Sequence, residues 1–345
     1  ANRIGVKEAV RMAVDYAQEA GLELPEWFTE RRESFDFSYV DVAIEGSIAT
    51  VRINRPEAMN ALNVTVVSQL GDVLDDLNSR EDVSTIVLEG AGKAFVAGAD
   101  VKFFVDKIRA DAIPDIYDFT ANGHIVLDKL ESSPKTTIAL TTGLALGGGL
   151  ELALSCDYRV GTRRTQFRFP ETSIGIYPGL GGTRRTPRIC GIECARFAVL
   201  AGNFLDAESA KALGLLTHLV DPSAVETTVS AIAAQGKPGE KYPSKPADSE
   251  HSVVSFATSF YSDDNIVSLL SGRVPEGYDS EDKVVSRQLK SLSRTAPIAL
   301  SMASDLLDTA TRSDLNSGLE SELQGLDSIF STDDALEGLR AWIEG

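Results

Sequence analysis

The stretch TTGLALGGGLELALSCD, residues 141–157, joins a short apolar strand pattern to an apolar helix pattern through the three glycines Gly147–Gly149. Glycine lets a backbone approach a ligand closely because it has no Cβ atom. The amides at a helix start are unpaired and lie at the positive end of the helix dipole. The stretch predicts either a site that stabilises a carbonyl oxygen acquiring negative charge or a simple tight strand-to-helix turn.

Two glutamates lie in apolar, glycine-rich surroundings. Glu151 falls in the first turn of the expected helix among leucines, and Glu171 follows Pro170 in FRFPETSIGIYPGLGGTRR (167–185). Each has a simpler interpretation, as a residue that compensates the helix dipole or as an ordinary first-turn residue after proline. Their positions differ by 20, which leaves room for one strand and its return. We therefore expect the two carboxyl groups to converge on one pocket, as general acid–base chemistry requires.

A third glycine-flanked piece, AGKAFVAGAD (91–100), also reads as the junction of a strand and a helix. Asp100 is placed to cap the helix that follows. A backbone amide of this turn is a candidate for the second donor to the carbonyl oxygen, with a plain turn as the alternative.

Strand and helix patterns alternate as far as about residue 220, which predicts an α/β layered fold. VDVAIEG and SIATVRIN are expected to pair around a Glu45-Gly46 turn, and helical spacing returns at 63–77. A segment rich in Pro, Gly, Lys and Ser follows at 235–250, and helical patterns alone occur beyond it, with Pro297 expected to begin a helix. The predicted divisions of the chain are a helical leader, a core and an α-helical C-terminal region, at 1–40, 41–235 and 236–345.

Composition excludes several classes of protein. The 345 residues include 33 Lys and Arg against 51 Asp and Glu, a net charge of −18, which argues against a phosphate-tracking nucleic-acid surface and an anionic membrane surface. No apolar run is long enough to cross a membrane, and the N-terminus lacks the pattern of a signal peptide. Three cysteines cannot form a disulfide scaffold, and buried thiols in a cytoplasmic protein are expected. The sequence has no GxSxG, no HExxH and no acid–imidazole cluster for a metal.

Five ordered motifs together carry a resemblance to a known family. They are INRPEAMNALN (53–63), KAFVAGADVK (93–102), GLALGGGLELALSCDYRV (143–160), FPETSIGIYPGLGGTRRTPR (169–188) and LAGNFLDAESAKALGLLTHLVD (200–221). With this set the chain resembles the enoyl-CoA hydratase/isomerase, or crotonase, superfamily, in its hydratase branch.

The resemblance implies a crotonase-like spiral of strand–strand–helix units with a helical C-terminal region, assembled as a homotrimer or hexamer. It implies an acyl-CoA thioester substrate of fatty acid β-oxidation, no metal and no cofactor apart from the CoA of the substrate. The oxyanion hole falls on the amides of Ala99 and Gly148. Glu151 would activate water and Glu171 would supply a proton to Cα, although the sequence alone leaves this division open. Further substrate-binding positions fall on Arg55, Ala58, Ala97, Gly98, Asp100, Lys102, Gly147 and Gly179.

Two features resemble other enzymes of acyl-CoA chemistry. The C-terminal region resembles that of 3-hydroxyisobutyryl-CoA hydrolases, but those enzymes lack the glutamate that stands here as Glu151 and usually carry an acid where this chain has Gly179. The alternatives to hydration are thioester hydrolysis, double-bond isomerisation, which typically needs one carboxylate, and an acyl-CoA-binding or scaffold subunit without activity. The opening ANRIGV resembles a phrase of 3-hydroxyacyl-CoA dehydrogenases, which suggests the hydratase part of a fusion with such an enzyme. The candidates for lining an acyl tunnel, with plain core or a trimer contact as the alternative, are Phe103, Phe104, Ile108, Ile113 and Ile116.

Overall fold

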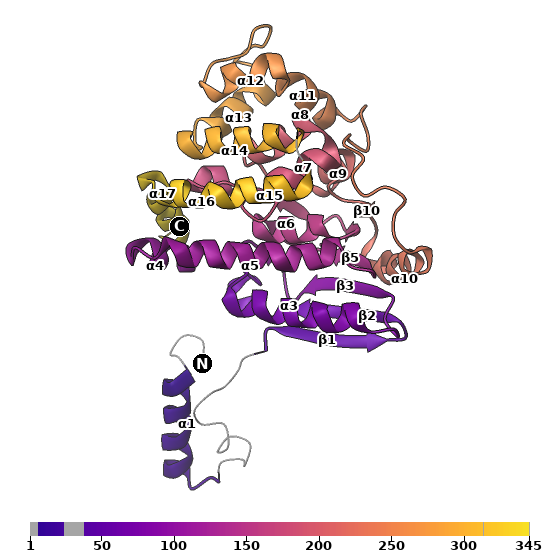
Figure 1. Cartoon of the computed structure of the whole chain (residues 1–345), viewed down its shortest axis with the longest axis vertical. Coiled ribbons are helices and arrows are strands. Elements are labelled where there is room, and N and C mark those ends of the chain that lie inside the picture. The colour runs from indigo at the N-terminus through magenta and orange to yellow at the C-terminus, as the bar shows by residue number, and fades with distance from the viewer. Residues whose placement is uncertain (1–5, 24–37, 313, 345) are drawn as a thin grey trace. The chain divides into compact units, whose positions relative to one another are not determined.

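The computed structural model describes residues 6–23, 38–312 and 314–344. Its chain forms two compact units, Ala1–Ser38 and Tyr39–Gly345, and each is described by itself. In the first unit, helix α1 spans Val6–Ala20 and confirms the helix expected in the leader (Figure 1). Residues 1–5, which hold most of the dehydrogenase-like ANRIGV phrase, lie outside the described residues.

The larger sheet of the second unit has six strands in the order β1-β2-β3-β5-β7-β10. Figure 1 labels β1, β2, β3, β5 and β10. Their bounds are Val40–Glu45, Ile48–Ile53, Thr85–Gly90, Thr136–Leu140, Tyr158–Gly161 and His218–Leu219. β1 and β2 form the expected antiparallel hairpin, with Gly46 at φ +59° in its turn, and the other neighbours run parallel. Parallel neighbours need crossover connections, which explains why strand and helix patterns alternate along the sequence.

A smaller sheet of four strands, in the order β4-β6-β8-β9, positions the glycine-rich turns. Its strands span Ala94–Ala97, Leu144–Leu146, Gln166–Arg168 and Leu205–Asp206. β4, β6 and β8 are parallel, and their register aligns Ala97 with Leu146 and Leu146 with Arg168. The residues that follow these three aligned strand ends are therefore brought to one edge of the sheet. Two strands, β7 and β8, lie between Glu151 and Glu171, so the expectation of a single strand there was wrong.

Helices cover both sheets within the core. They are α3 (Val64–Ser79), α4 (Val101–Arg109), α5 (Ile113–Glu131), α6 (Gly148–Ser155), α7 (Gly182–Cys190), α8 (Ile192–Leu200), α9 (Ala207–Leu213) and α10 (Val225–Gln235). Short 3-10 turns are η1 (Pro56–Ala58), η2 (Glu171–Ile174) and η3 (Pro222–Ala224). α3 confirms the helix expected near 63–77, and the Asn63 side chain caps it by accepting a hydrogen bond from the Val66 amide. Asp100 precedes α4 as expected, but its side chain makes no capping hydrogen bond because it pairs with Arg55 instead.

The regular structure among the described residues beyond 235 is helical, and none of these residues lies in a strand. These helices are α11 (Ser252–Phe260), α12 (Asp263–Leu270), α13 (Lys283–Leu292), α14 (Pro297–Ala310), α15 (Leu315–Gln324), α16 (Leu326–Phe330) and α17 (Asp333–Glu344). Pro297 begins α14, as expected. α15 and α16 pack on α5, and α17 packs on α4 and η2 (Figure 1). The C-terminal helices thus contact the elements that carry the glycine-rich turns and Glu171.

Candidate active site

The backbone of Ala99 and that of Gly148 lie close together at the edge where β4 and β6 end. Leu62 forms an isolated parallel bridge with Ala99, in which the Leu62 amide donates to the Gly98 carbonyl and the Asp100 amide donates to the Leu62 carbonyl. In such a bridge the central residue directs its own N–H away from the partner strand, so the Ala99 N–H points away from Leu62. A Cβ built on Gly148 would lie 3.7 Å from the Ala99 nitrogen. Gly148 is the first residue of α6, where amides have no intrahelical partner.

Gly147 makes the close approach of this turn to Glu171 possible. Its φ of +45° and ψ of −123° lie outside the regions that L-residues adopt. A Cβ at this position would lie 2.1 Å from the Glu171 Oε1 atom. A residue with a side chain at 147 would therefore be strained and would also occupy the space of the Glu171 carboxyl group.

Glu151 is held by two amides of the loop that precedes α7. Its side chain is 1% exposed, and its Oε1 atom accepts hydrogen bonds from the Leu180 and Gly182 amides at 2.7 Å each. Burial raises the pKa of Glu151 to about 7, although the two amides and the Arg185 guanidinium favour the ionised form. Such a carboxyl group exchanges a proton near neutral pH, which suits a general base.

Glu171 begins the 3-10 turn η2 after Pro170, and its side chain is buried. Its Oε2 atom has no hydrogen-bond partner among the described residues. Burial first, and the neighbouring Glu151 second, raise the pKa of Glu171 well above its ordinary value, and the Arg168 guanidinium lowers it. Glu171 is therefore protonated under conditions in which an exposed glutamate is ionised.

The two carboxyl groups and the two amide-bearing turns line one cleft. Its remaining surface is mostly apolar and comes from the core and from the C-terminal helices; it includes Val101, Phe104, Phe119, Leu146, Ile176, Tyr177, Leu180, Leu326, Phe330, Leu339 and Trp342. Of the candidate acyl-tunnel residues, Phe104 lines the cleft and Ile116 is fully buried in the core. The cleft thus presents polar groups at one place and an apolar surface around them, as binding sites for small molecules do.

The substrate-binding positions expected from the sequence divide into two groups. Ala97, Gly98, Gly147 and Gly179 line the cleft together with Ala99, Gly148 and the two glutamates. Arg55, Ala58, Asp100 and Lys102 do not line it. The Arg55 guanidinium is 2.8 Å from the Asp100 carboxylate, and the exposed Lys102 ammonium is 2.8 Å from that of Asp106.

A third buried carboxyl group, Glu322 of α15, was missed by the sequence analysis. It lies behind the loop that binds Glu151, where its Oε2 atom accepts a hydrogen bond from the Gly181 amide at 2.7 Å. Glu322 is fully buried. The available signal was its helical spacing from Leu319 and Leu326, which puts an acid on the apolar face of the helix.

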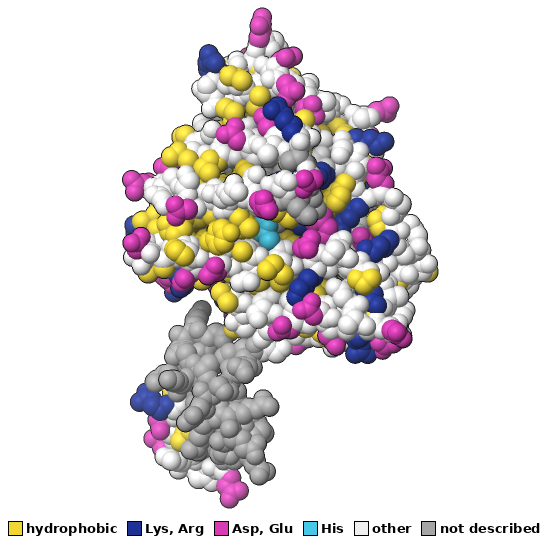
Figure 2. All heavy atoms as spheres, in the orientation of Figure 1, with side chains coloured by type: hydrophobic (Ala, Val, Ile, Leu, Met, Phe, Trp, Pro, Cys, Tyr) yellow, Lys and Arg dark blue, Asp and Glu magenta, His cyan; other side chains and the backbone are white. Residues whose placement is uncertain are grey.

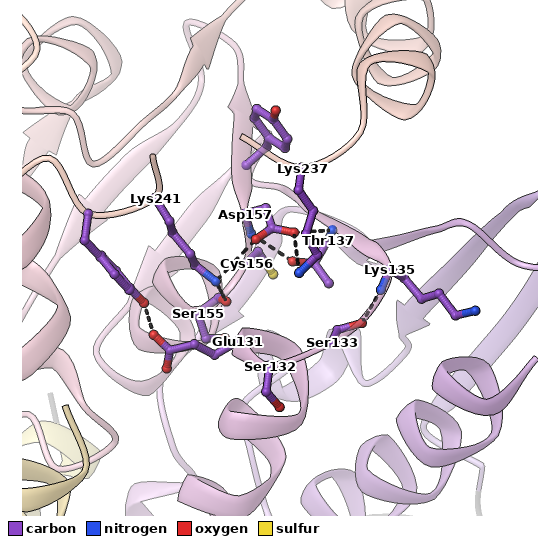
Figure 3. A network of polar contacts seen from close by, with 12 residues as sticks. Glu131, Ser132, Ser133, Lys135, Thr137, Ser155, Cys156, Asp157, Lys237 and Lys241 are labelled. Atoms are coloured by element: carbon purple, nitrogen blue, oxygen red, sulfur yellow. Dashed lines mark hydrogen bonds and ion pairs between the residues drawn. The ribbon is translucent and has the colours of Figure 1, made fainter. Parts of the chain in front are cut away.

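The Pro- and Lys-rich segment that follows α10 contacts the C-terminal end of α6 through two lysine side chains (Figure 3). The Lys241 ammonium donates to the Ser155 carbonyl at 2.7 Å and lies 3.5 Å from the Asp157 carboxylate. Lys237 lies 3.7 Å from the same carboxylate, which also accepts a hydrogen bond from the Thr137 amide. These contacts hold the C-terminal end of the helix whose first residue is Gly148.

Cys156, Cys190 and Cys194 are free and buried, as expected. Among the residues that the structure describes, no group of three or more His, Cys, Asp or Glu residues could hold a metal ion. No helix within the described ranges is long and apolar enough to span a bilayer.

Two amide donors beside two buried carboxyl groups define a site that can polarise a carbonyl group and move protons next to it. Residues 48–344 match the model of a protein family described as enoyl-CoA hydratase/isomerase. The chain belongs to this family of enzymes and has its crotonase fold.

The chain is 29% identical over 301 residues to a short-chain-enoyl-CoA hydratase of Clostridium acetobutylicum, with 87% of this chain and 92% of the relative covered. It is 36% identical over 192 residues to a crotonyl-CoA hydratase of Syntrophomonas wolfei, covering 55% of this chain and 72% of that protein. A carnitinyl-CoA dehydratase structure from Mycobacterium thermoresistibile has a TM-score of 0.76 at 23% identity, covering 89% of this chain and 90% of that one. This last likeness concerns the fold.

Proposed function

We propose that the protein is an enoyl-CoA hydratase, which adds water reversibly and with syn stereochemistry to a trans-2-enoyl-CoA to give a 3-hydroxyacyl-CoA. The observation that carries the proposal is the presence of Glu151 and Glu171, both buried, on one cleft with the turns of Ala99 and Gly148. Relatives named enoyl-CoA hydratase and crotonyl-CoA hydratase support it.

In this mechanism the thioester oxygen accepts hydrogen bonds from the Ala99 and Gly148 amides. The polarised double bond is then electrophilic at Cβ, and ionised Glu151 removes a proton from water as the water oxygen attacks that carbon. The negative charge that develops on the thioester oxygen is stabilised by the two amides, each donor of this kind contributing about 2.7–4 kcal/mol in well-studied cases. Protonated Glu171 gives its proton to Cα. A proton passes back from Glu151 to Glu171 before the next turnover, so the substrate alone is changed by addition of water.

Purified protein should abolish the ultraviolet absorbance of the conjugated double bond of crotonyl-CoA near neutral pH and release no thiol. Release of free CoA thiol, detected with a thiol reagent, would assign the alternative of thioester hydrolysis. Turnover of a 3-enoyl-CoA without hydrated product would assign isomerisation. Tight binding of CoA with no turnover of either substrate would contradict an enzymatic role in this chemistry.

The rate of crotonyl-CoA hydration should follow a bell-shaped pH profile. Glu151 must be ionised, and its pKa of about 7 makes kcat/KM fall as the pH drops below that value. Glu171 must be protonated, and its raised pKa makes the rate fall again at alkaline pH as this group ionises. A rate that is constant from pH 5 to 9, with circular dichroism showing a folded protein throughout, would contradict the assignment.

We further propose that CoA lies across the outer end of the cleft near Arg55, Ala58 and Lys102. Lys102→Ala should raise KM for crotonyl-CoA a few-fold with kcat nearly unchanged, because an exposed ion pair contributes about 0.2–1 kcal/mol. Added salt should reduce this difference. The control is Lys290→Ala on the exposed side of α13; an equal rise in KM for both variants would contradict a local role of Lys102.

We also propose assembly as a homotrimer or hexamer. Hydrophobic side chains gather on one face of the molecule over α4, α5 and α16 (Figure 2). Helix α5 also carries the exposed hydrophobic residues Tyr117 and Ile125, which are 46% and 55% exposed. Exposed apolar patches commonly mark protein interfaces. Light scattering of the protein after gel filtration should give a molar mass three or six times that of the chain. A monomer at micromolar concentration would exclude this assembly.

A further inference from the structure

The loop from Gly179 to Thr183 lies between two buried carboxyl groups that come from distant parts of the sequence, Glu151 and Glu322. The amides of Leu180 and Gly182 donate to Glu151, and the amide between them, that of Gly181, donates to Glu322. All three distances are 2.7 Å. Successive amides of the loop thus point alternately to Glu151 and to Glu322.

Glu322 accepts two further hydrogen bonds, from residues at and just before this loop. Its Oε1 atom accepts a hydrogen bond from the Thr183 hydroxyl at 2.5 Å. Its own backbone carbonyl accepts a hydrogen bond from the Tyr177 hydroxyl at 2.5 Å. One contact joins α15 to Thr183 at the end of the loop and the other joins it to Tyr177 just before the loop, so Glu322 ties the loop to the C-terminal region.

Two carbonyl groups of the loop also accept hydrogen bonds from side chains. The His124 Nε2 atom lies 2.6 Å from the Gly179 carbonyl oxygen and therefore carries the proton in this hydrogen bond. The Arg185 guanidinium donates to the Leu180 carbonyl at 2.9 Å. Gly181 has a φ of +94°, and a Cβ there would lie 2.0 Å from the Arg185 Nη1 atom. The conformation that directs two amides at Glu151 is thus specified by residues of α5, α7 and α15.

We propose that Glu322 is a positioning residue for Glu151: by holding the Gly181 amide and the Thr183 hydroxyl, it keeps the Leu180 and Gly182 amides aimed at the Glu151 carboxylate. This inference rests on the proposed role of Glu151 in hydration. Two amide donors favour the ionised carboxylate, so their orientation sets the proton affinity of the base. A side chain of the helical C-terminal region thereby tunes a group at the start of α6.

The charged and titratable groups around Glu151 determine how the proposal is tested. Arg185 faces it from α7, Glu171 from η2 and Glu322 from α15, while His124 of α5 lies 3.7 Å from Glu322. Burial, and next the Glu151 charge, raise the pKa of Glu322 to about 8, so it is mostly neutral at pH 7. Burial lowers the pKa of His124 to about 4, so it is neutral as well. Glutamine, neutral and able to accept a hydrogen bond, is accordingly a close substitute for Glu322 at neutral pH.

The test compares Glu322→Leu, which cannot hold the loop, with Glu322→Gln, which can. Glu320→Leu, on the exposed side of the same helix, is the matched control. Side-chain carboxyl groups are labelled with carbon-13 and titrated by NMR, and the Glu151 signal is identified by its absence in Glu151→Gln. We expect the Glu151 titration to move to higher pH in Glu322→Leu and to stay in place in Glu322→Gln and Glu320→Leu.

Kinetics give the second readout. Glu322→Leu should lower kcat for crotonyl-CoA by about tenfold to a hundredfold, the effect of misplacing a catalytic group by about 1 Å. The acid limb of its pH profile should shift to higher pH, whereas Glu322→Gln should keep the wild-type rate and profile.

If Glu322→Leu does not fold, Glu322→Asp is the second variant. Its carboxyl group is one methylene short of Gly181, and it should show the same shifts with smaller magnitude. A Glu151 titration unmoved in the folded leucine or aspartate variant overturns the proposal, even where kcat falls. Failure of the wild-type protein to hydrate any enoyl-CoA would instead overturn the proposed function, and the NMR titration distinguishes the two.

Discussion

Glu151→Gln and Glu171→Gln should each lower kcat for crotonyl-CoA hydration by about 10²–10⁴-fold, the usual contribution of a positioned acid or base. Glutamine keeps the size and polarity of each side chain but can neither take a proton from water nor give one to Cα. In Glu151→Gln the amide oxygen can still accept the Leu180 and Gly182 hydrogen bonds, so the loop should keep its place. Steady-state kinetics with crotonyl-CoA measure the effect.

Thermal unfolding and CoA binding should remain close to wild type in both variants, because the loss concerns proton transfer. Glu320→Gln, an exposed change on α15, is the control for a glutamate-to-glutamine change away from the cleft. Wild-type rates in both cleft variants would show that the pair of carboxyl groups does not carry the reaction.

Gly147→Ala should lower turnover by about a hundredfold or more, because the new methyl group needs the space of the Glu171 carboxyl oxygen. A Cβ at position 147 would lie 2.1 Å from the Glu171 Oε1 atom, closer than non-bonded atoms can approach. Glu171 or the turn must therefore move, and a displacement of about 1 Å at a catalytic group can cost about 10²-fold in rate. The strained backbone at this position adds a loss of stability.

Gly46→Ala separates strain from steric conflict. Gly46 also has a positive φ, of +59°, but a Cβ there has nothing within 4 Å. This control should lower the melting temperature slightly and leave kcat unchanged. Equal activity of Gly147→Ala and wild type would mean that the Glu171 carboxyl group need not lie where the structure has it.

Much of the fold follows from local patterns. The hairpin around Gly46, the helix near 63–77 and the start of α14 at Pro297 were predicted, since each depends on residues close together in the sequence. The glycines at 147–149 predicted the turn into α6 for the same reason. The meeting of Glu151 and Glu171 at one cleft was expected from their spacing, although two strands rather than one separate them.

The parts that were missed depend on contacts between distant segments. Strands were expected before the turns at 98 and 147, but not that they form a second sheet. The strands of this sheet have only two to four residues, too few for a clear alternation of apolar and polar residues. α7 begins after glycines and contains Pro187, which ordinarily argues against a helix. Asp100 was expected to cap α4, but a guanidinium 45 residues away competes for its carboxylate. Glu322 acquires its role only because α15 folds back on the loop at Gly181, some 141 residues earlier in the chain.

The most direct measurement is a crystal structure of the Glu151→Gln variant with crotonyl-CoA bound. The thioester oxygen should lie about 2.7–3.1 Å from both the Ala99 and Gly148 nitrogens, the range for donors that stabilise an oxyanion. The side chain at 151 should face Cβ through a water molecule, and the Glu171 carboxyl group should face Cα. A thioester oxygen that contacts neither amide, or a Glu171 carboxyl group turned away from the bound acyl chain, would contradict the proposed hydration chemistry.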